Sequence, residues 1–510
     1  MQRACGSGLL AAIWRRVRLP AALLLYPALC CGCQTWQLSH SSALSAWSAG
    51  DVSAAAEHLE TARGSRGAER ELLKLDLAMV DLARGEAIAA ESRFRELREE
   101  LAYLSQRDLA EQTAALFTDA RATSYSGRDY ERQMVLSLGL LSSLMSGSGD
   151  AFAWSLQAEE QTALRWQELS DGAEAGVATL DPASVSESPG VVEQAEWESD
   201  GVGVAAGNSS PAVVPAGQDA PLAMASWLTA VVQSETPSRA IETEAALQQV
   251  AFWSGDKSDR VPGRGLGVRC ARGNGSLNVI VLAGRAPEWE SESAEPTSKA
   301  LLIADRILSA TGRHTLPPPL VSVKIGRPRV VWRAGSAVPV ICRLRSGGAG
   351  EQPRILSLTT VVDLNAAAQA SYEAHRDEEL AAAVVRRVVK KGTVYAVKET
   401  AQISDNTLVD FGMNAAGVVW EALEKPETRS WMTLPALVLA AQEELPAGEH
   451  RLELLGPVPD FGSRPSHGEF VVRVEDGRNT NVVCVVPDKT IAGSILISGP
   501  ERKTVPPPER

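Results

Sequence analysis

Residues that bind metals or form disulfide bonds are scarce in this chain of 510 residues, which has six histidines and seven cysteines. Four cysteines lie within the first 33 residues, and the other three, Cys270, Cys342 and Cys484, are far apart. No His-x-x-x-His or Cys-x-x-Cys pair occurs after residue 33, so the sequence predicts no zinc site. At most one bridge can form among the three remaining thiols, and the sequence leaves its three pairings open.

Motifs of common enzyme classes are also missing. There is no Gly-x-Ser-x-Gly turn, and the glycines at 263, 265 and 267 have neither the spacing of a dinucleotide loop nor the Lys-Ser/Thr of a phosphate loop. Cys342 or Cys484 could act as a nucleophile only beside a histidine brought close by folding. We therefore predict no catalytic residue, no metal ion and no cofactor.

Positive charge and long apolar runs are limited as well. Fifty Lys and Arg against 63 Asp and Glu give a net charge of -13, which disfavours binding to nucleic acid. Hydrophobic residues make up 45% of the chain, enough to bury substantial cores. The apolar stretch Leu19–Leu29 is shorter than the roughly 20 residues that a spanning helix needs.

The amino terminus has the pattern of an export signal, in which arginines precede the apolar stretch and cysteines follow it. Small residues followed by cysteine resemble a bacterial lipobox, which implies cleavage after residue 32 and lipidation (palmitate) of Cys33, with Cys31 as the alternative. An ordinary secretory signal is the other interpretation. Residues 1–32 are thus predicted to be a signal peptide. The mature protein is expected at the cell membrane or outer membrane, lipid-anchored and facing the periplasm.

A helical repeat with a period near 35 residues follows. Gly50, Ala55 and Leu59 have the same spacing as Gly85, Ala90 and Phe94, which resembles the tetratricopeptide (TPR) pattern of a turn glycine, a small residue and a bulky residue. A weaker third copy has Trp154 at the place of the small residue. We predict TPR-like repeats at 33–169 and a final helical pair at 223–255, with a further helix at 108–117.

Two segments read as disordered. Residues 170–222 are expected to be an acidic insertion because the stretch from Ser170 to Pro221 is rich in small and acidic residues and lacks Lys and Arg. Residues 499–510 are expected to be a disordered Pro-rich tail.

Residues 263–498 have short β-branched runs typical of strands, together with two helical stretches at 366–400 and 406–425. The small residues of the second stretch predict a close helical hairpin; insertion of this hairpin into a membrane is the less favoured alternative. Strand-turn-strand units are expected around Pro446-Ala447-Gly448 and from 470 to 486. The fold class is therefore multidomain, an all-α TPR-like domain followed by an α+β domain with antiparallel strands and a helical hairpin.

The segment Glu427-Thr-Arg-Ser-Trp-Met-Thr-Leu-Pro435 resembles one found in a family of uncharacterised bacterial lipoproteins with TPR-like amino-terminal halves. Further similar stretches are Gly127–Arg132, Ser276–Val281 and Leu445–His450. The resemblance implies an envelope location and this two-part architecture, but no activity.

Arg429 and Trp431 are the candidate partner-binding residues, because an arginine beside an aromatic ring suits protein recognition. The alternative is that Arg429 caps the hairpin and Trp431 fills the core. We predict a non-enzymatic adaptor or assembly factor of the cell envelope, which binds a protein partner through its TPR-like surface and the membrane through its lipid. A cell-wall enzyme, or a regulator of a peptidoglycan synthase, acting through the α+β domain, is the alternative.

Overall fold

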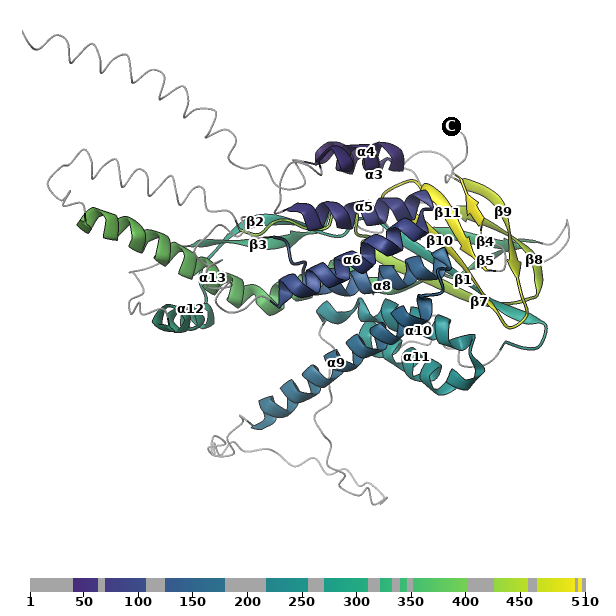
Figure 1. Ribbon diagram of the computed structural model, residues 1–510, viewed down its shortest axis with the longest axis horizontal. Helices are drawn as coiled ribbons and strands as arrows, with labels where there is room; N and C mark the ends of the chain where they lie inside the picture. Colours follow the sequence, from purple (N-terminus) through teal and green to yellow (C-terminus); the bar gives the residue numbers. More distant parts are fainter. Residues whose placement is uncertain are drawn as a thin grey trace, which may run out of the picture.

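The computed structural model describes residues 40–62, 69–106, 124–178, 217–255, 270–310, 322–332, 340–345, 352–400, 426–456, 466–499 and 503–506. Helices form the amino-terminal region and sheets dominate the carboxy-terminal region (Figure 1). The signal peptide with Cys33, the glycine-rich segment at 263 and the expected helices at 108–117 and 406–425 lie outside the described residues.

The amino-terminal region consists of helices that pack against their neighbours along the chain. They are α3 (Ser41–Ser48), α4 (Val52–Ala62), α5 (Arg70–Arg84), α6 (Ala87–Ser105), α8 (Asp129–Ser146), α9 (Ala151–Ala178), η4 (Gly217–Asp219), α10 (Leu222–Ser234), η5 (Pro237–Arg239) and α11 (Ala240–Ser254).

The residues of the first two repeats occupy equivalent places. Gly50 and Gly85 follow the ends of α3 and α5 with φ angles of +78° and +91°, which glycine adopts readily. The small and bulky positions of both repeats, Ala55, Leu59, Ala90 and Phe94, are all buried. The spacing in the sequence therefore corresponds to two similar helical turns and two similar packed faces.

The third helical pair accommodates Trp154 where the first two pairs have alanine. Trp154 is buried, and it packs against Gly139 on the facing helix α8. A Cβ atom at Gly139 would lie 2.5 Å from the Trp154 ring, closer than real contacts allow. In this pair the small residue, Gly139, lies on the first helix, and the bulky residue, Trp154, lies on the second.

The prediction of a disordered insertion over residues 170–222 is wrong at both ends of that range. Helix α9 continues to Ala178, while η4 begins at Gly217 and α10 at Leu222. The prediction relied on the acidic and small residues of this range. One of these acids, Asp219, is nevertheless buried through packing, which local composition does not reveal.

Strands of the carboxy-terminal region form three sheets. The strands are β1 (Asn274–Ala283), β2 (Glu288–Ala294), β3 (Val323–Arg329), β4 (Ile341–Arg345), β5 (Arg354–Leu356), β6 (Thr359–Asp363), β7 (Leu437–Pro446), β8 (Gly448–Leu455), β9 (Ser466–Val474), β10 (Asn479–Val486), β11 (Ala492–Ser498) and β12 (Lys503–Val505). Their orders are β12-β11-β10-β1-β7-β6, β5-β4-β8-β9 and β2-β3. Helices α12 (Ser298–Ala310) and α13 (Leu364–Thr400) complete the region.

The antiparallel strand pairing is confirmed for most pairs, including β1 with β7 and β10 with β11, but the central strands β1 and β10 pair in parallel, so the six-stranded sheet is mixed. Two other predictions were wrong. Strands β7 and β8 belong to different sheets, as do β9 and β10, so each turn is a corner between sheets and not a hairpin. Lys503–Val505 pairs with β11, so this part of the tail is ordered.

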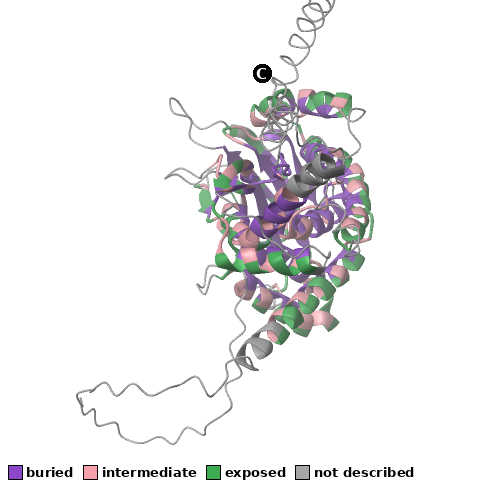
Figure 2. Ribbon diagram, turned by 90° about the vertical axis from the view of Figure 1, so that its left-hand side faces the viewer, coloured by how far each residue is buried: buried purple, intermediate pink, exposed green. Residues whose placement is uncertain are grey.

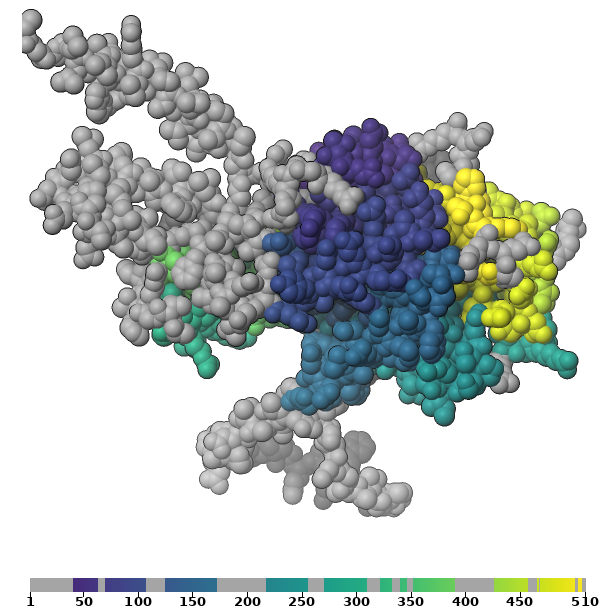
Figure 3. Space-filling view, in the orientation of Figure 1, coloured from purple at the N-terminus to yellow at the C-terminus, as the bar shows by residue number. Residues whose placement is uncertain are grey.

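The helices cover one face of the six-stranded sheet, and the four-stranded sheet covers the other (Figures 1 and 2). Strand β1 contributes side chains to the cores on both faces of the sheet. Ile280 and Leu282 belong to the core shared with the helices. Leu277, Val279 and Val281 belong to the core between the two sheets. The space-filling view shows the helices as one continuous surface with strands emerging at its edge (Figure 3). The inner side of the helical stack is therefore occupied by the chain's own sheet.

Candidate functional site

The predicted partner-contact residues Arg429 and Trp431 lie inside the protein, each with 1% of its surface exposed. The Arg429 Nε atom donates to the carboxylate of Glu427, at 2.9 and 3.0 Å from its two oxygens. The guanidinium carbon lies 5.6 Å from the centroid of the Tyr125 ring, within the range of a cation–π contact.

Trp431 fills the core between the helices and the six-stranded sheet. Its ring centroid is 6.1 Å from that of Phe94, and its Nε1 donates to the Thr433 hydroxyl at 3.0 Å. The interpretation of Arg429 and Trp431 as partner contacts is therefore corrected, because burial leaves neither side chain accessible to a second protein. They hold the segment at 427–433 in place.

Two buried carboxylates from the helices, Asp76 on α5 and Glu131 on α8, bind this segment; we call the pair the carboxylate clasp. Glu131 accepts the backbone N–H of Trp431 at 3.1 Å and the hydroxyl of Tyr125. Asp76 Oδ1 accepts both the backbone N–H and the hydroxyl of Thr433, each at 2.9 Å. The clasp thus joins the helical region to the entry into β7.

Burial raises the pKa of Asp76 to about 7, although its hydrogen bonds to Thr433 act in the opposite direction and the neighbouring Glu131 adds to the rise. Its second oxygen, Oδ2, is buried and has no hydrogen-bond partner, an arrangement that suits a protonated carboxyl. Both acids of the clasp are 0% exposed. Because a substrate could not reach them in this conformation, we interpret the clasp as structural.

Arg128, at the start of α8, links the clasp to α13 and β2. Its guanidinium carbon lies 3.2 Å from the centroid of the Trp289 ring, and its Nη1 is 3.5 Å from the Glu379 carboxylate. Its Nη2 donates to the backbone carbonyl of Glu427 at 3.3 Å. This cation, with 13% of its side chain exposed, therefore contacts three segments that are distant in the sequence.

The three cysteines outside the amino-terminal segment are free. Burial raises the pKa of Cys342 to about 12 and also raises the pKa of Cys484, which keeps both thiols protonated. A nucleophilic cysteine needs a lowered pKa and access to solvent. Neither thiol has the environment of a catalytic group. Among the described residues, no group of three His, Cys, Asp or Glu side chains is placed to hold a metal ion.

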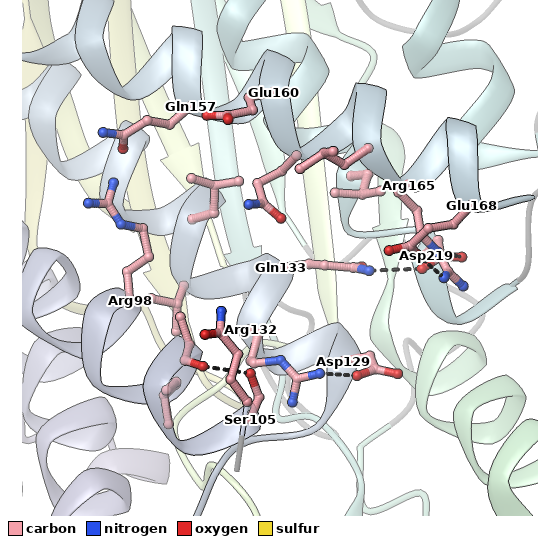
Figure 4. Close-up of a pocket in the computed structure, with 18 residues that line it drawn as sticks. Arg98, Ser105, Asp129, Arg132, Gln133, Gln157, Glu160, Arg165, Glu168 and Asp219 are labelled. Carbon is pink, nitrogen blue, oxygen red and sulfur yellow. Dashed lines mark hydrogen bonds and ion pairs between the residues drawn. The ribbon is translucent and has the colours of Figure 1, made fainter. Parts of the chain in front are cut away.

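A groove of about 680 Å³ lies between α6, α8 and α9; we call it the helical groove (Figure 4). Helix α8 contributes Asp129, Arg132, Gln133, Val135 and Leu136; α6 and the residue after it contribute Arg98, Leu101, Ala102, Ser105 and Gln106; α9 contributes Gln157, Glu160, Gln161, Leu164, Arg165 and Glu168; Asp219 and Leu222 complete the lining. All of these residues except Gln106 lie in helices.

An ion-pair network orders one part of the groove. Asp219 is 1% exposed, and its carboxylate accepts Arg165 Nε at 2.9 Å and Gln133 Nε2 at 2.8 Å. Arg165 also donates to Glu168 at 2.8 Å. Burial raises the pKa of Asp219, while Gln133 and Arg165 act against the rise. These contacts fix the side chains before any ligand arrives.

Two glutamines of the lining have a carboxamide oxygen without a hydrogen-bond partner. The Oε1 atoms of Gln133 and Gln157 are buried, and neither has a hydrogen-bond partner. Gln157 lies near Arg98, across the groove from Gln133 (Figure 4). The guanidinium of Arg98 stacks 4.9 Å from the centroid of the Trp154 ring. The groove therefore contains paired charges, whereas its two unpartnered carboxamide oxygens are shielded from solvent.

Comparisons with protein-family models, with curated proteins and with solved structures find no match to this chain. In the described part of the chain, no helix combines the length and apolar character needed to cross a bilayer.

Sequence reasoning missed the helical groove because its residues come from helices that are far apart in the chain. One available signal was the pair Gln157 and Gln161, which recur at i and i+4 and so share a face of α9. A polar face on a helix is usually solvated, so this signal alone does not identify a groove.

Proposed function

We propose that this protein is a non-enzymatic adaptor or assembly factor of the bacterial cell envelope, anchored by a lipid on Cys33, which binds a protein partner through the helical groove. The observation that carries the proposal is the groove itself. It is preformed by paired side chains and is lined by both polar and apolar residues. Such a surface favours association, because a ligand can bury apolar area on it without reordering the side chains.

The groove replaces the inner face of the helical stack as the proposed partner surface. TPR-like stacks offer a concave side to ligands, but here the inner side of the helices packs on the six-stranded sheet. Only a surface on the remaining sides is open to a partner, and the helical groove is such a surface.

The helices are proposed to be TPR-like repeats. The equivalent turn glycines at 50 and 85, the buried alanines at 55 and 90, and the packing of helices against their chain neighbours support this proposal. The resemblance of the 427–435 segment to envelope lipoproteins supports the location.

The pattern of charges favours an adaptor over an enzyme. Arg132 is paired with Asp129, and Arg165 with Asp219 and Glu168, so these charges neutralise one another instead of converging on an open point. General acid–base catalysis needs a titratable group directed at a reacting atom. A regulator of a peptidoglycan synthase would be one adaptor of this kind.

Site-specific photo-crosslinking in the native host tests the proposal. A benzoylphenylalanine in place of Gln161, which lines the groove, should cross-link one envelope protein. The same group in place of Gln167, which is exposed on α9 outside the lining, serves as the matched control. Equal cross-linking from both positions, or none from either, contradicts the proposal.

A blocking variant provides a second arm. Ala102 is exposed and lines the groove, so Ala102→Trp should fill it and abolish the cross-link from position 161. Ala163→Trp, at an exposed position outside the lining, should leave the cross-link intact. Retention of the cross-link in Ala102→Trp would place the partner elsewhere.

A further inference from the structure

We infer that a second surface, formed by α9 and α11, binds a basic amphipathic helix of about 14 residues from a partner protein. We call this surface the α9–α11 face, and its main residues are Phe152, Leu156, Ala163, Trp166, Ile241 and Phe252. It lies apart from the helical groove, so the inference does not depend on the proposed function.

Helix α9 presents exposed apolar residues at alternating steps of four and three. Phe152, Leu156 and Trp166 are each 39–44% exposed, and Ala163 is exposed between them. The remaining position of this repeat is Glu159, whose carboxylate accepts the side-chain amide of a glutamine on α10. Residues at this spacing lie on one face of a helix. The helical groove is lined by other positions of α9.

Helix α11 has a matching row. Ile241 is 84% exposed, Ala245 and Gln248 are also exposed, and Phe252 is half-buried. These four positions are spaced by four, three and four residues, so they share one face of α11. Three of the four are apolar, which is the pattern of a helix that packs on a neighbour.

Two contacts hold the rows of α9 and α11 next to each other. The Trp166 ring centroid is 4.5 Å from that of Phe252, and the guanidinium carbon of Arg239, just before α11, lies 4.8 Å from the centroid of Phe152. The same order of contacts along both helices shows that they run in the same direction, over about 21 Å. Both helices also pack on α10 (Figure 1). The exposed apolar residues therefore form one continuous face, and such faces mark interaction sites.

The position of α11 explains why its apolar row is open. Among the described elements, α11 is the last helix of the amino-terminal region and is followed by β1. The terminal helix of a stack normally has a polar outer face, because no further helix covers it. Two adjacent helices with a three-four repeat form the holes into which a third helix packs. A bound helix that spans the shared 21 Å has about 14 residues.

The surrounding charge favours a basic partner. Helix α9 contains five acidic residues and one arginine, and α11 contains two acidic residues and no Lys or Arg. The arginine of α9, Arg165, is already paired with Asp219 and Glu168. Lys or Arg beside the apolar side of a bound helix would meet the remaining carboxylates, such as that of exposed Glu244. A second copy of the chain, or an anionic membrane surface, would bring like charges together.

Selection from a library of 21-residue peptides displayed on phage, with the full chain as the target, tests this inference. The library fixes Leu at the a and d positions of three heptads and varies the other positions among Lys, Glu, Gln and Ala. We expect the enriched peptides to carry a net positive charge. Absence of enrichment, or enrichment of acidic peptides, overturns the inference.

A matched pair of variants locates the bound peptide. Ile241→Glu should weaken the binding of the synthetic peptide at least tenfold, because it places a carboxylate among apolar contacts. The control is Ile88→Glu, which should bind as wild type does. Ile88 is 71% exposed and, like Ile241, is the second residue of its helix, where Glu suits the helix dipole. Equal binding by Ile241→Glu and wild type contradicts the inference.

A second pair separates this face from the helical groove. Ala163→Trp, which alters the middle of the α9–α11 face, should weaken peptide binding at least tenfold, and Ala102→Trp in the groove should leave it unchanged. Thermal melting verifies that each variant is folded. The reverse pattern would place the peptide in the groove and overturn the inference. Ile241→Glu should also keep the cross-link from position 161, which tests the proposed function separately.

Two further measurements would reveal a different occupant. In sedimentation of the full chain, a dimer that Ile241→Glu dissociates and Ile88→Glu does not would assign the face to a second copy. In flotation with vesicles of phosphatidylcholine and phosphatidylglycerol, Cys33→Ala removes the proposed lipid anchor. Vesicle binding that is then lost in Ile241→Glu would assign the face to a membrane surface. We expect neither result, and either one overturns the inference.

Discussion

Thr433 donates its backbone N–H and its hydroxyl to the same carboxylate oxygen of Asp76, although the two residues are 357 positions apart in the chain. Asp76 lies on a helix of the amino-terminal region, and Thr433 leads into β7 of the main sheet. The contact lies in the core that both regions share. Since the helices bury their inner side on the sheet, separating the two regions would break both hydrogen bonds and expose this apolar core to water.

Asp76 should make stability depend on pH. Its folded pKa of about 7 lies above the ordinary value of 3.8, so the folded state binds the proton more tightly than the unfolded chain. The stabilisation is complete below pH 3.8 and is lost as pH rises through 7. Relative to Asp76→Asn, wild type should lose on the order of 2 to 3 kcal/mol of unfolding free energy between pH 5 and pH 8. Urea denaturation measures this difference.

Asp305→Asn is the control for this prediction, because Asp305 is exposed on α12. Its free energy of unfolding should follow that of wild type at every pH in the series. If the free energy of unfolding of Asp76→Asn shows the same pH dependence as that of wild type, the pKa of Asp76 is not raised in the folded state.

Trp431→Ala should destabilise the fold by about 3 to 5 kcal/mol, because it removes a large aromatic side chain from the shared core. Trp166→Ala, at a position 44% exposed, should cost about 1 kcal/mol through loss of its contact with Phe252. Thermal unfolding compares the two. Below its melting temperature, Trp431→Ala should keep the cross-link from position 161. Loss of that cross-link while the protein stays folded would indicate that Trp431 contributes to partner binding.

The effect of Gly139→Ala on the free energy of unfolding should reverse in sign when Trp154 is replaced by alanine. In wild type the added methyl group meets the Trp154 ring at 2.5 Å, and the overpacking should cost about 1 to 3 kcal/mol. In a Trp154→Ala background the clash is absent, and the same change should stabilise α8 by about 1 kcal/mol through helix propensity. A double-mutant cycle by urea denaturation provides the test. Equal effects in both backgrounds would mean that Gly139 does not make room for Trp154.

Gly493→Ala should be more damaging than Gly149→Ala, although both glycines have positive φ angles, +62° and +89°. A Cβ atom at Gly493 would lie 2.1 Å from the backbone oxygen of Ala83, where α5 meets β11, while nothing lies within 4 Å of one at Gly149. Backbone strain should cost about 1 to 2 kcal/mol at each site, and the clash about 1 to 3 kcal/mol more at Gly493. Equal decreases in the melting temperatures of the two variants would argue against the close approach of Gly493 to Ala83.

Lipidation at Cys33 can be tested by metabolic labelling with a palmitate analogue. We expect Cys33→Ala to lose the label and to leave the membrane fraction, because a single cysteine carries the anchor in the proposed signal. Cys31→Ala is the matched comparison and should keep both properties. The reverse result would move the modification to Cys31, and membrane retention by both variants would contradict a lipid anchor at either position.

The sequence by itself determined the local elements. The spacing of Gly50 and Gly85 with their alanines predicted two helical turns, and the strand-turn-strand units around 446–448 and from 470 to 486 predicted β7 to β10, because helix and strand periodicities are properties of neighbouring residues. Composition could not reveal that Ala178 belongs to a helix or that residues 503–505 pair with β11. Residues 503–505 pair with the preceding strand, and Thr504 also lies beside Gly85 of the helical region, a contact that composition cannot show.

Only the tertiary structure decided which surfaces are available. The sequence pointed to Arg429 and Trp431 because arginine and tryptophan are common in interfaces, yet burial against Tyr125 and Phe94 makes them part of the interior. The helical groove, in contrast, appears only when α6, α8 and α9 come together. The physical reason is that exposure is set by packing between elements far apart in the chain, which no local pattern of residues encodes.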